Sequence, residues 1–340
     1  MNRNDALLQD WRARALATEA EVGKSVIGQA RVIHLINIAI FARGHVLLEG
    51  DVGVGKTTLL RAFARVLGGG YERVEGTIDL MPNDLIYHTY ISEEGKPRVE
   101  PGPLLKCGEA LATFFFNEIN RARPQVHSLL LRAMAERSVS AFNRTYRFPH
   151  LVVFADRNRV EKEETFEIAS AARDRFMLEV LIETPDDAQI RERLLFDPDY
   201  HNVELLLERV ASGLVPYAEL NALSSIIQEE TQSSAALRRY ALELWRATCQ
   251  PASFGVALDD IDMTQLVMAG ASPRAMSMLL RAARVSAWLA ERNFVTPEDV
   301  QQVFFESIGH RVFFNPVYEL RRSEVARAFL QGVLQKVAAP

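Results

Sequence analysis

The chain has 340 residues, of which 48% are hydrophobic and 24% are charged, and its formal net charge is −5. This length favours two domains over a single core. The acidic balance argues against a protein that binds nucleic acid chiefly through phosphate contacts, although it permits a local basic strip. Cys107 and Cys249 lie far apart without His or Cys at metal-ligand spacing. They predict neither a zinc site nor a disulfide framework and are typical of a reduced compartment.

The N-terminal stretch, residues 1–21, is polar and amphipathic and lacks the continuous apolar block of a signal peptide. Nowhere does the chain contain an uninterrupted apolar run of about 18 residues, the length that a membrane-spanning helix needs. We therefore expect a cytoplasmic protein with no membrane span.

The first half of the chain alternates short apolar runs with helical patterns, which predicts a parallel α/β sheet. The expected strands cover His45–Glu49, Tyr71–Glu75, Thr113–Phe116, Leu151–Ala155 and Leu178–Ile182. Helices are expected at about 30–42, 55–67 and 124–136. These elements predict an αβα nucleotide-binding core over residues 1–185.

Two segments interrupt this pattern. Ser138–Phe148 alternates in polarity and contains Asn143-Arg144, which predicts a hairpin added to the core. Asp79–Pro103 is a long polar connection, and a loop of that length is usually functional or carries small elements of its own.

Strand signals stop after Thr184-Pro185, and residues 186–340 read as a smaller all-α domain. Two of its helix starts are clear. Ser272-Pro273 provides a capping hydroxyl followed by a proline at the first helical position. Thr296-Pro297 does the same and is followed by an acidic first turn.

A phosphate-binding loop follows the first predicted strand. The loop and the start of its helix comprise Gly50, Asp51, Val52, Gly53, Val54, Gly55, Lys56, Thr57 and Thr58. They match GxxxxGK[ST] between a strand and a helix, the context that this motif requires. Glycines let backbone N–H groups turn toward phosphates at the positive end of the helix. We expect ATP here, with Lys56 on its β- and γ-phosphates and the Thr57 hydroxyl on Mg²⁺.

A P-loop ATPase also needs a strand that ends in carboxylates, one for Mg²⁺ and one for the attacking water. The strand that ends in Asn117-Glu118 is the best candidate. Glu118 is expected to activate the water. Asn117 can accept a hydrogen bond from a magnesium-bound water, but it carries no charge, so we expect weaker Mg²⁺ binding or slower turnover.

Asn117–Ala122 is similar to the Asp-Glu-Ile-Asn-Arg-Ala motif of the MoxR branch of AAA+ ATPases, and Pro101–Leu104 resembles the Pro-Gly-Pro segment of that family. The resemblance to this family covers nearly the whole chain. Val26–Gln29 looks like the family's entry motif, which implies that Ile27 and Gly28 lie beside the adenine. Asn158 falls at the sensor 1 position, where a polar side chain orients the attacking water.

The resemblance also implies roles for two arginines. Asp174-Arg175-Phe176 resembles the segment that carries the family's arginine finger, which completes the site of a neighbouring subunit. Gly270–Ala275 is similar to the sensor 2 signature, so Arg274 is expected to reach the nucleotide from the second domain.

The sequence departs from the family at the end of the fourth strand. Asp156, Arg157 and Arg159 surround Asn158, where the family usually has neutral polar residues and a proline. Asp156 has two interpretations that the sequence leaves open: it supplies a substitute carboxylate, or it pairs with Arg157 or Arg159.

By resemblance, the chain is expected to form a homo-oligomeric ring, often a hexamer, that remodels, matures or assembles a partner complex. Family members often work with a von Willebrand factor A-type partner, which here would be a separate chain. The client has no readable signature. Residues 79–103 and 138–148 have two interpretations that the sequence leaves open: they make remodelling contacts, or they are ordinary surface connections.

Two other functions are compatible with the sequence. Asn117 favours a structural or regulatory ring subunit that binds ATP but hydrolyses it weakly. Arg144 and Arg147 in the predicted hairpin are the only support for a nucleic-acid motor, and the acidic balance counts against it.

Overall fold

The computed structural model describes residues 3–158 and 166–340, which form two compact units. The N-terminal unit comprises Met1–Phe176 with Val180–Ala222, and the C-terminal unit comprises Leu223–Pro340 with Met177–Glu179. Each unit is described by itself below.

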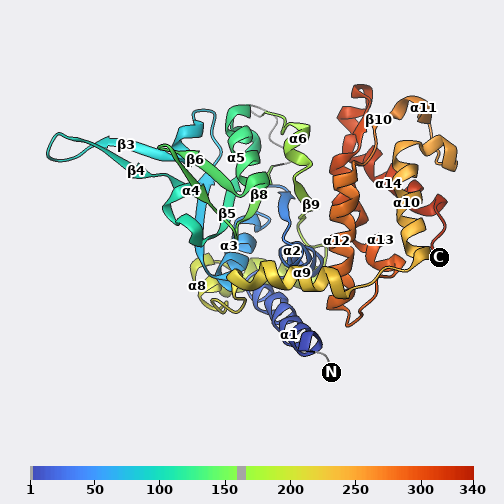
Figure 1. The fold of residues 1–340 in the computed structure, drawn as a ribbon, viewed down its shortest axis with the longest axis horizontal. Helices are drawn as coiled ribbons and strands as arrows, with labels where there is room; N and C mark the ends of the chain where they lie inside the picture. Colours follow the sequence, from blue (N-terminus) through green and yellow to red (C-terminus); the bar gives the residue numbers. More distant parts are fainter. Residues whose placement is uncertain (1–2, 159–165) are drawn as a thin grey trace. The chain divides into compact units, whose positions relative to one another are not determined.

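A five-stranded sheet is the centre of the N-terminal unit (Figure 1). Its strands, in spatial order, are β2 (Gly70–Glu75), β5 (Leu111–Asn117), β8 (Val152–Arg157), β1 (His45–Glu49) and β9 (Phe176–Leu181). The pairs β2–β5, β5–β8 and β8–β1 all run parallel. The expected parallel α/β core is confirmed, and all five strands lie within two residues of their predicted limits.

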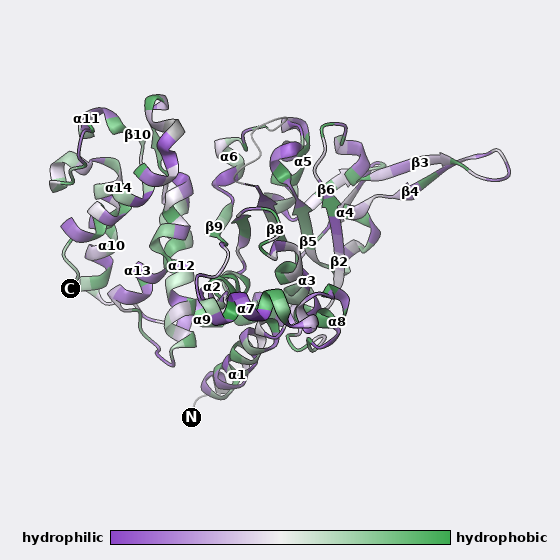
Figure 2. Cartoon of the chain, turned by 180° about the vertical axis from the view of Figure 1, so that it is seen from behind, coloured by the Kyte–Doolittle hydropathy of each residue, from purple (hydrophilic) through white to green (hydrophobic). Residues whose placement is uncertain are grey.

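Helices cover both faces of the sheet because its central strands are apolar on both sides. Phe115 and Phe154 are paired in register, and the ring of Phe154 lies 6.5 Å from that of Phe63 on α3 (Lys56–Leu67). Phe116 points to the other face and joins a buried cluster with Val126 of α5 (Pro124–Glu136). In Figure 2, β5 is coloured hydrophobic and the edge strand β2 is largely hydrophilic.

The remaining helices of the N-terminal unit surround this sheet. They are α1 (Arg3–Gly23), α2 (Ala30–Phe41), α4 (Pro103–Lys106), α6 (Ser170–Arg173), α7 (Ala188–Phe196) and α8 (Val203–Glu208). None of the helices in the described part of the chain is long and apolar enough to cross a membrane.

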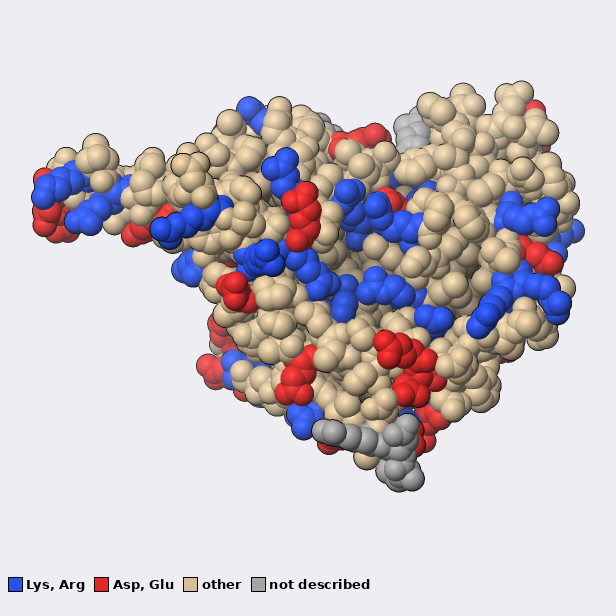
Figure 3. Space-filling model, in the orientation of Figure 1, with Lys and Arg blue, Asp and Glu red and all other residues tan. Residues whose placement is uncertain are grey.

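Both insertions form antiparallel hairpins. The 79–103 connection carries β3 (Tyr87–Ile91) and β4 (Pro97–Pro101), which extend from the unit as an arm (Figure 1). Charges of both signs gather on this arm (Figure 3). The predicted hairpin at 138–148 is confirmed as β6 (Ser138–Ala141) and β7 (Arg144–Arg147), joined through Phe142 and Asn143 at positive φ.

The N-terminal unit continues past the expected domain boundary at 185, as far as Ala222. The reason is that the 200–215 segment packs along α3. Arg61 donates two hydrogen bonds to Glu204 at 2.7 and 2.9 Å, and the backbone N–H of Val215 donates to the carbonyl of Val66.

The C-terminal unit is mainly helical, as expected. Its helices are α9 (Leu220–Glu230, which begins in the N-terminal unit), α10 (Ala235–Cys249), α11 (Met263–Leu266), α12 (Pro273–Leu289), α13 (Pro297–Ile308) and α14 (Arg322–Lys336). This unit also contains one small sheet that the sequence did not predict. Short strands β10 (Val267–Ala269) and β11 (Phe313–Phe314) pair antiparallel.

Both predicted helix starts in this unit are confirmed. The Ser272 hydroxyl accepts a hydrogen bond from the N–H of Ala275 at 3.0 Å. At the start of α13, Asp299 accepts from the N–H of Thr296 at 2.8 Å and from Arg292 at 2.6 and 2.7 Å. Asp299 is only 2% exposed. This buried carboxylate therefore caps the start of α13 and also forms an ion pair with Arg292.

We expect Asp299→Ala to lower the free energy of unfolding by about 2 kcal/mol, because the change removes a helix cap and leaves the half-buried Arg292 without its carboxylate partner. Chemical denaturation followed by circular dichroism measures this. Glu298→Ala, which removes an exposed carboxylate from the same turn, is the control. Equal losses in the two variants would contradict the role assigned to Asp299.

Candidate functional site

The loop after β1 has a backbone that only glycine adopts without strain. Gly53 and Gly55 have φ angles of 83° and 90°, in the left-handed region. Gly50 is needed for a different reason: a Cβ there would lie 2.4 Å from the carbonyl oxygen of Ile182. The loop then leads directly into α3 at Lys56, so its N–H groups lie at the positive end of a helix.

Lys56 is the centre of a buried polar network. Its ammonium donates to the carbonyl oxygens of Gly50 at 2.7 Å and Asp51 at 2.9 Å. It also donates to Oδ1 of Asn158 at 2.7 Å, across 102 residues of sequence. The side chain is 7% exposed. The predicted sensor residue therefore touches the predicted phosphate-binding lysine.

The network continues from Asn158 to the end of β5. The amide Nδ2 of Asn158 donates to Oε1 of Glu118 at 3.1 Å, and Arg121 donates to Oε2 at 3.0 Å. Asn117, the last residue of β5, is 7% exposed. The structure thus brings Lys56, Asn158 and Glu118 into one chain of hydrogen bonds, with Asn117 beside Glu118.

Glu118 has a strained backbone. Its φ and ψ are 52° and 50°, a left-handed conformation that costs a non-glycine residue on the order of 1 kcal/mol. Its N–H donates to Oδ1 of Asp156 at 2.6 Å. On the other side Gly76 packs so closely that a Cβ there would lie 2.2 Å from the Glu118 carbonyl oxygen. These contacts hold the carboxylate of Glu118 toward Asn158.

Asp156 is the residue of this site that sequence reasoning left undecided. It is 2% exposed, and Oδ2 lies 3.9 Å from the ammonium of Lys56. Burial raises the pKa of Asp156 to about 6, against the smaller lowering effects of the Glu118 N–H and Lys56. Arg157 donates to Glu49 at 2.6 Å instead of to Asp156, and Arg159 lies outside the described residues. The sequence signal for Asp156 was its acidic side chain next to Arg157 and Asn158, where the family usually has neutral polar residues.

The predicted adenine-side segment lies near the same loop. A Cβ on Gly55 would lie 3.9 Å from Val26. Gly28 has φ 75° and packs so tightly that a Cβ would lie 2.5 Å from Pro185. Gln29 donates to the carbonyl of Glu183 at 2.6 Å. Ile27 and Gly28 are therefore held between the phosphate-binding loop and the 183–185 segment.

The two predicted arginines lie on other elements. Arg175 follows α6 and donates to the carbonyl of Ala171 at 2.7 Å. Arg274 is exposed in the first turn of α12, in the C-terminal unit, where Ser272 caps the helix. Neither arginine forms one of the hydrogen bonds that join Lys56, Asn158 and Glu118.

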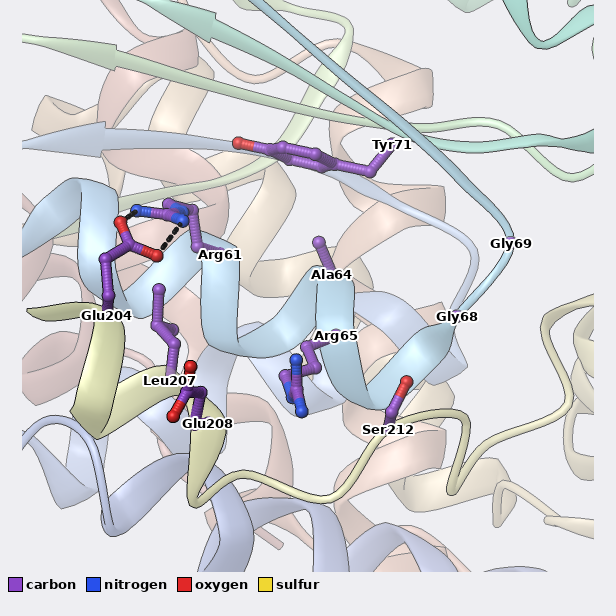
Figure 4. A pocket seen from close by; sticks show the side chains of 10 residues that line it. All are labelled: Arg61, Ala64, Arg65, Gly68, Gly69, Tyr71, Glu204, Leu207, Glu208 and Ser212. Carbon is purple, nitrogen blue, oxygen red and sulfur yellow. Dashed lines mark hydrogen bonds and ion pairs between the residues drawn. The ribbon is translucent and has the colours of Figure 1, made fainter.

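A separate cavity of about 400 Å³ lies between α3 and α8 (Figure 4). Arg61, Arg65, Tyr71 and Glu204 are among its lining residues. Arg61 and Glu204 pair across it, as the dashed lines in Figure 4 show. No residue of the phosphate-binding loop lines it, so this cavity is distinct from the site around Lys56.

Comparison with known proteins matches both units. Residues 45–178 match the model of the ATPase family associated with various cellular activities, and residues 263–331 match the AAA lid domain. Protein MoxR of Methylorubrum extorquens is 57% identical over 99% of this chain and 98% of its own length. The chain belongs to the MoxR family of AAA+ ATPases. The resemblance read from its motifs and the expected fold class are both confirmed.

Other relatives agree with this family membership. Protein MoxR of Paracoccus denitrificans is 53% identical over 99% of both chains. Chaperone MoxR1 of Mycobacterium tuberculosis is 32% identical over 94% of this chain and 81% of its own. The crystal structure of a candidate ATPase from Cytophaga hutchinsonii superposes with a TM-score of 0.82 at 28% identity, covering 99% of this chain and 98% of that one.

The raised pKa of Asp156 predicts how this MoxR-family chain responds to pH. A carboxyl whose pKa moves from 3.8 to about 6 on folding contributes stability below pH 3.8 and loses it as pH rises through about 6. The pKa differs between the unfolded and folded chain by about 2, and each pKa unit corresponds to about 1.4 kcal/mol, so the stability that is lost is on the order of 3 kcal/mol.

Asp156→Asn should therefore gain stability relative to the natural chain as pH rises from about 4.5 to about 7.5, because the amide does not ionise. Urea unfolding of both proteins at the two pH values measures the change. A stability difference that stays the same at both would show that the carboxyl of Asp156 ionises as it does in water.

Proposed function

We propose that this MoxR-family protein binds ATP with Mg²⁺ and hydrolyses it in a homo-oligomeric ring, a hexamer, that remodels a partner protein complex. The observation that carries the proposal is the continuous chain of hydrogen bonds from Lys56 through Asn158 to Glu118. It links the group that binds phosphate to the group that activates water, through a residue placed between them.

The phosphate-binding residues are Gly50 to Thr58. Their backbone N–H groups and Lys56 would hold the phosphates, and Ile27 and Gly28 would lie beside the base. Thr57 and Asn117 present a hydroxyl and an amide oxygen, which are suitable donors to Mg²⁺ or to its bound waters. The ion would neutralise phosphate charge. The carboxylate of Glu118 would accept the proton of the attacking water, and Asn158 would orient that water.

The remaining roles depend on assembly. Arg175 would act on the nucleotide of a neighbouring subunit, and Arg274 would contact the nucleotide from the C-terminal unit. One relative is described as a chaperone, which supports a remodelling role. The β3–β4 arm and the β6–β7 hairpin are the surfaces we assign to partner contacts, and a separate von Willebrand factor A-type protein is the partner class we propose.

Asn117 supports a second function, that of a ring subunit which binds ATP but turns it over slowly. An amide at this buried position brings no negative charge to a divalent ion. Turnover by the natural chain distinguishes this function from the first.

We expect Lys56→Ala to lose ATP binding, because the change removes the ammonium at the centre of the network. Glu118→Gln should keep binding and lose hydrolysis by roughly 100-fold or more, since the amide cannot accept a proton. Nucleotide titration and steady-state phosphate release measure the two effects. Rapid turnover by Glu118→Gln would refute the role of Glu118, and a natural chain without measurable turnover would favour the regulatory subunit.

Arg175→Ala should leave nucleotide binding in the isolated chain intact but reduce hydrolysis in the assembled ring, by about 1,000-fold if the arginine acts in trans. Mixing this variant with Lys56→Ala provides a matched test. An Arg175→Ala subunit keeps its own nucleotide site, and a neighbouring Lys56→Ala subunit keeps Arg175. The Arg175→Ala subunits should therefore regain turnover in mixed rings. Failure of the mixture to exceed the activity of either variant alone would argue against a finger in trans.

A further inference from the structure

The carboxylate of Asp156 is buried next to Asn117, on the same face of the sheet. Strands β5 and β8 pair Phe115 with Phe154, and the next positions on that face are Asn117 and Asp156. The ring of Phe154 contacts Phe63, which shows that this face is the one covered by α3. Neighbouring strands lie about 4.8 Å apart. The amide and the carboxylate are therefore lateral neighbours below the phosphate-binding loop.

Both oxygens of Asp156 face groups of the candidate site. Oδ1 accepts from the N–H of Glu118 at 2.6 Å, and Oδ2 lies 3.9 Å from the ammonium of Lys56. The side chain therefore contacts the backbone of the predicted water-activating residue and the phosphate-binding lysine. No residue of the separate cavity between α3 and α8 is involved.

A buried charge of this kind is costly. A carboxylate taken out of water is destabilising unless it is paired and hydrogen-bonded. Asp156 is 2% exposed, Lys56 is at the limit of an ion pair, and Arg157 is engaged with Glu49. Burial raises the pKa of Asp156, in agreement with incomplete compensation. A costly charge beside a nucleotide site indicates a functional role more than a structural one.

We propose that Asp156 supplies, from the adjacent strand, the negative charge for the magnesium–nucleotide complex that Asn117 does not provide. In this proposal the carboxylate lies on β8, one strand away from its expected position at Asn117 on β5, and on the same face of the sheet. This inference rests on the proposed ATPase function and names a residue that neither the family match nor the motifs assign. It makes the site compatible with Mg²⁺ despite the amide at the end of β5.

The test is the Mg²⁺ dependence of nucleotide binding, measured without turnover. A fluorescent ADP analogue is titrated into the full chain with Mg²⁺ and with EDTA. Asp156→Asn should reduce the Mg²⁺-dependent gain in affinity by about 10-fold to 100-fold, the range typical for groups around a metal site. Binding in EDTA should change little, which also shows that the variant is folded.

Two further variants make the test specific. Asn117→Asp combined with Asp156→Asn returns the carboxylate to β5 and should restore the Mg²⁺-dependent gain. Glu75→Gln is the matched control. Glu75 lies on β2, the other neighbour of β5, in register with Asn117, but its side chain is 60% exposed. This change should leave the Mg²⁺ dependence as in the natural chain.

Three results would overturn the inference: an unchanged Mg²⁺ dependence in Asp156→Asn, an equal loss of affinity with and without Mg²⁺, or a double variant that recovers nothing. A larger effect of Glu75→Gln than of Asp156→Asn would assign the charge to the other strand. If the natural chain binds no nucleotide, the proposed function itself fails, and this inference fails with it. If the natural chain binds nucleotide and the Asp156→Asn change does not alter the Mg²⁺ dependence of binding, this inference fails but the proposed function stands.

Discussion

The ammonium of Lys56 is the group on which the candidate site depends. It contacts two carbonyl oxygens of its own loop and the amide of Asn158, which in turn donates to Glu118. The loop after β1, the end of β5 and the end of β8 are thereby joined through side chains. This is possible because parallel strands place their carboxyl ends at one edge of the sheet, where an open α/β fold binds its ligand.

The charge at this edge is distributed unusually. Glu118 and Asp156 are acidic and Asn117 is neutral, although Asn117 occupies the position where the resemblance leads us to expect aspartate. Asp156 also accepts from the N–H of Glu118, whose left-handed backbone needs support. One buried carboxylate thus stabilises a strained residue and places a negative charge beside Lys56.

The fold differed from its sequence-based expectation where packing over long distances decides the outcome. The N-terminal unit ends near 222 instead of 185, because Glu204 and Val215 bond to α3. The connection at 79–103 contains a hairpin whose strands are exposed on both sides, so its sequence carries little of the polarity alternation that marks a half-buried strand. Strands β10 and β11 are too short to give a periodic signal.

The sequence by itself determined the family, the central strands and the phosphate-binding loop, because apolar runs, glycines and helix caps act within a few residues of each other. It also placed Asn158 and Glu118 at the correct strand ends. Only the tertiary structure decided what Asp156 contacts, since the choice between Arg157, Lys56 and the N–H of Glu118 depends on which face of β8 the side chain occupies and on what packs there. Burial, which sets the pKa and the cost of that charge, is likewise a property of the folded chain and not of the local sequence.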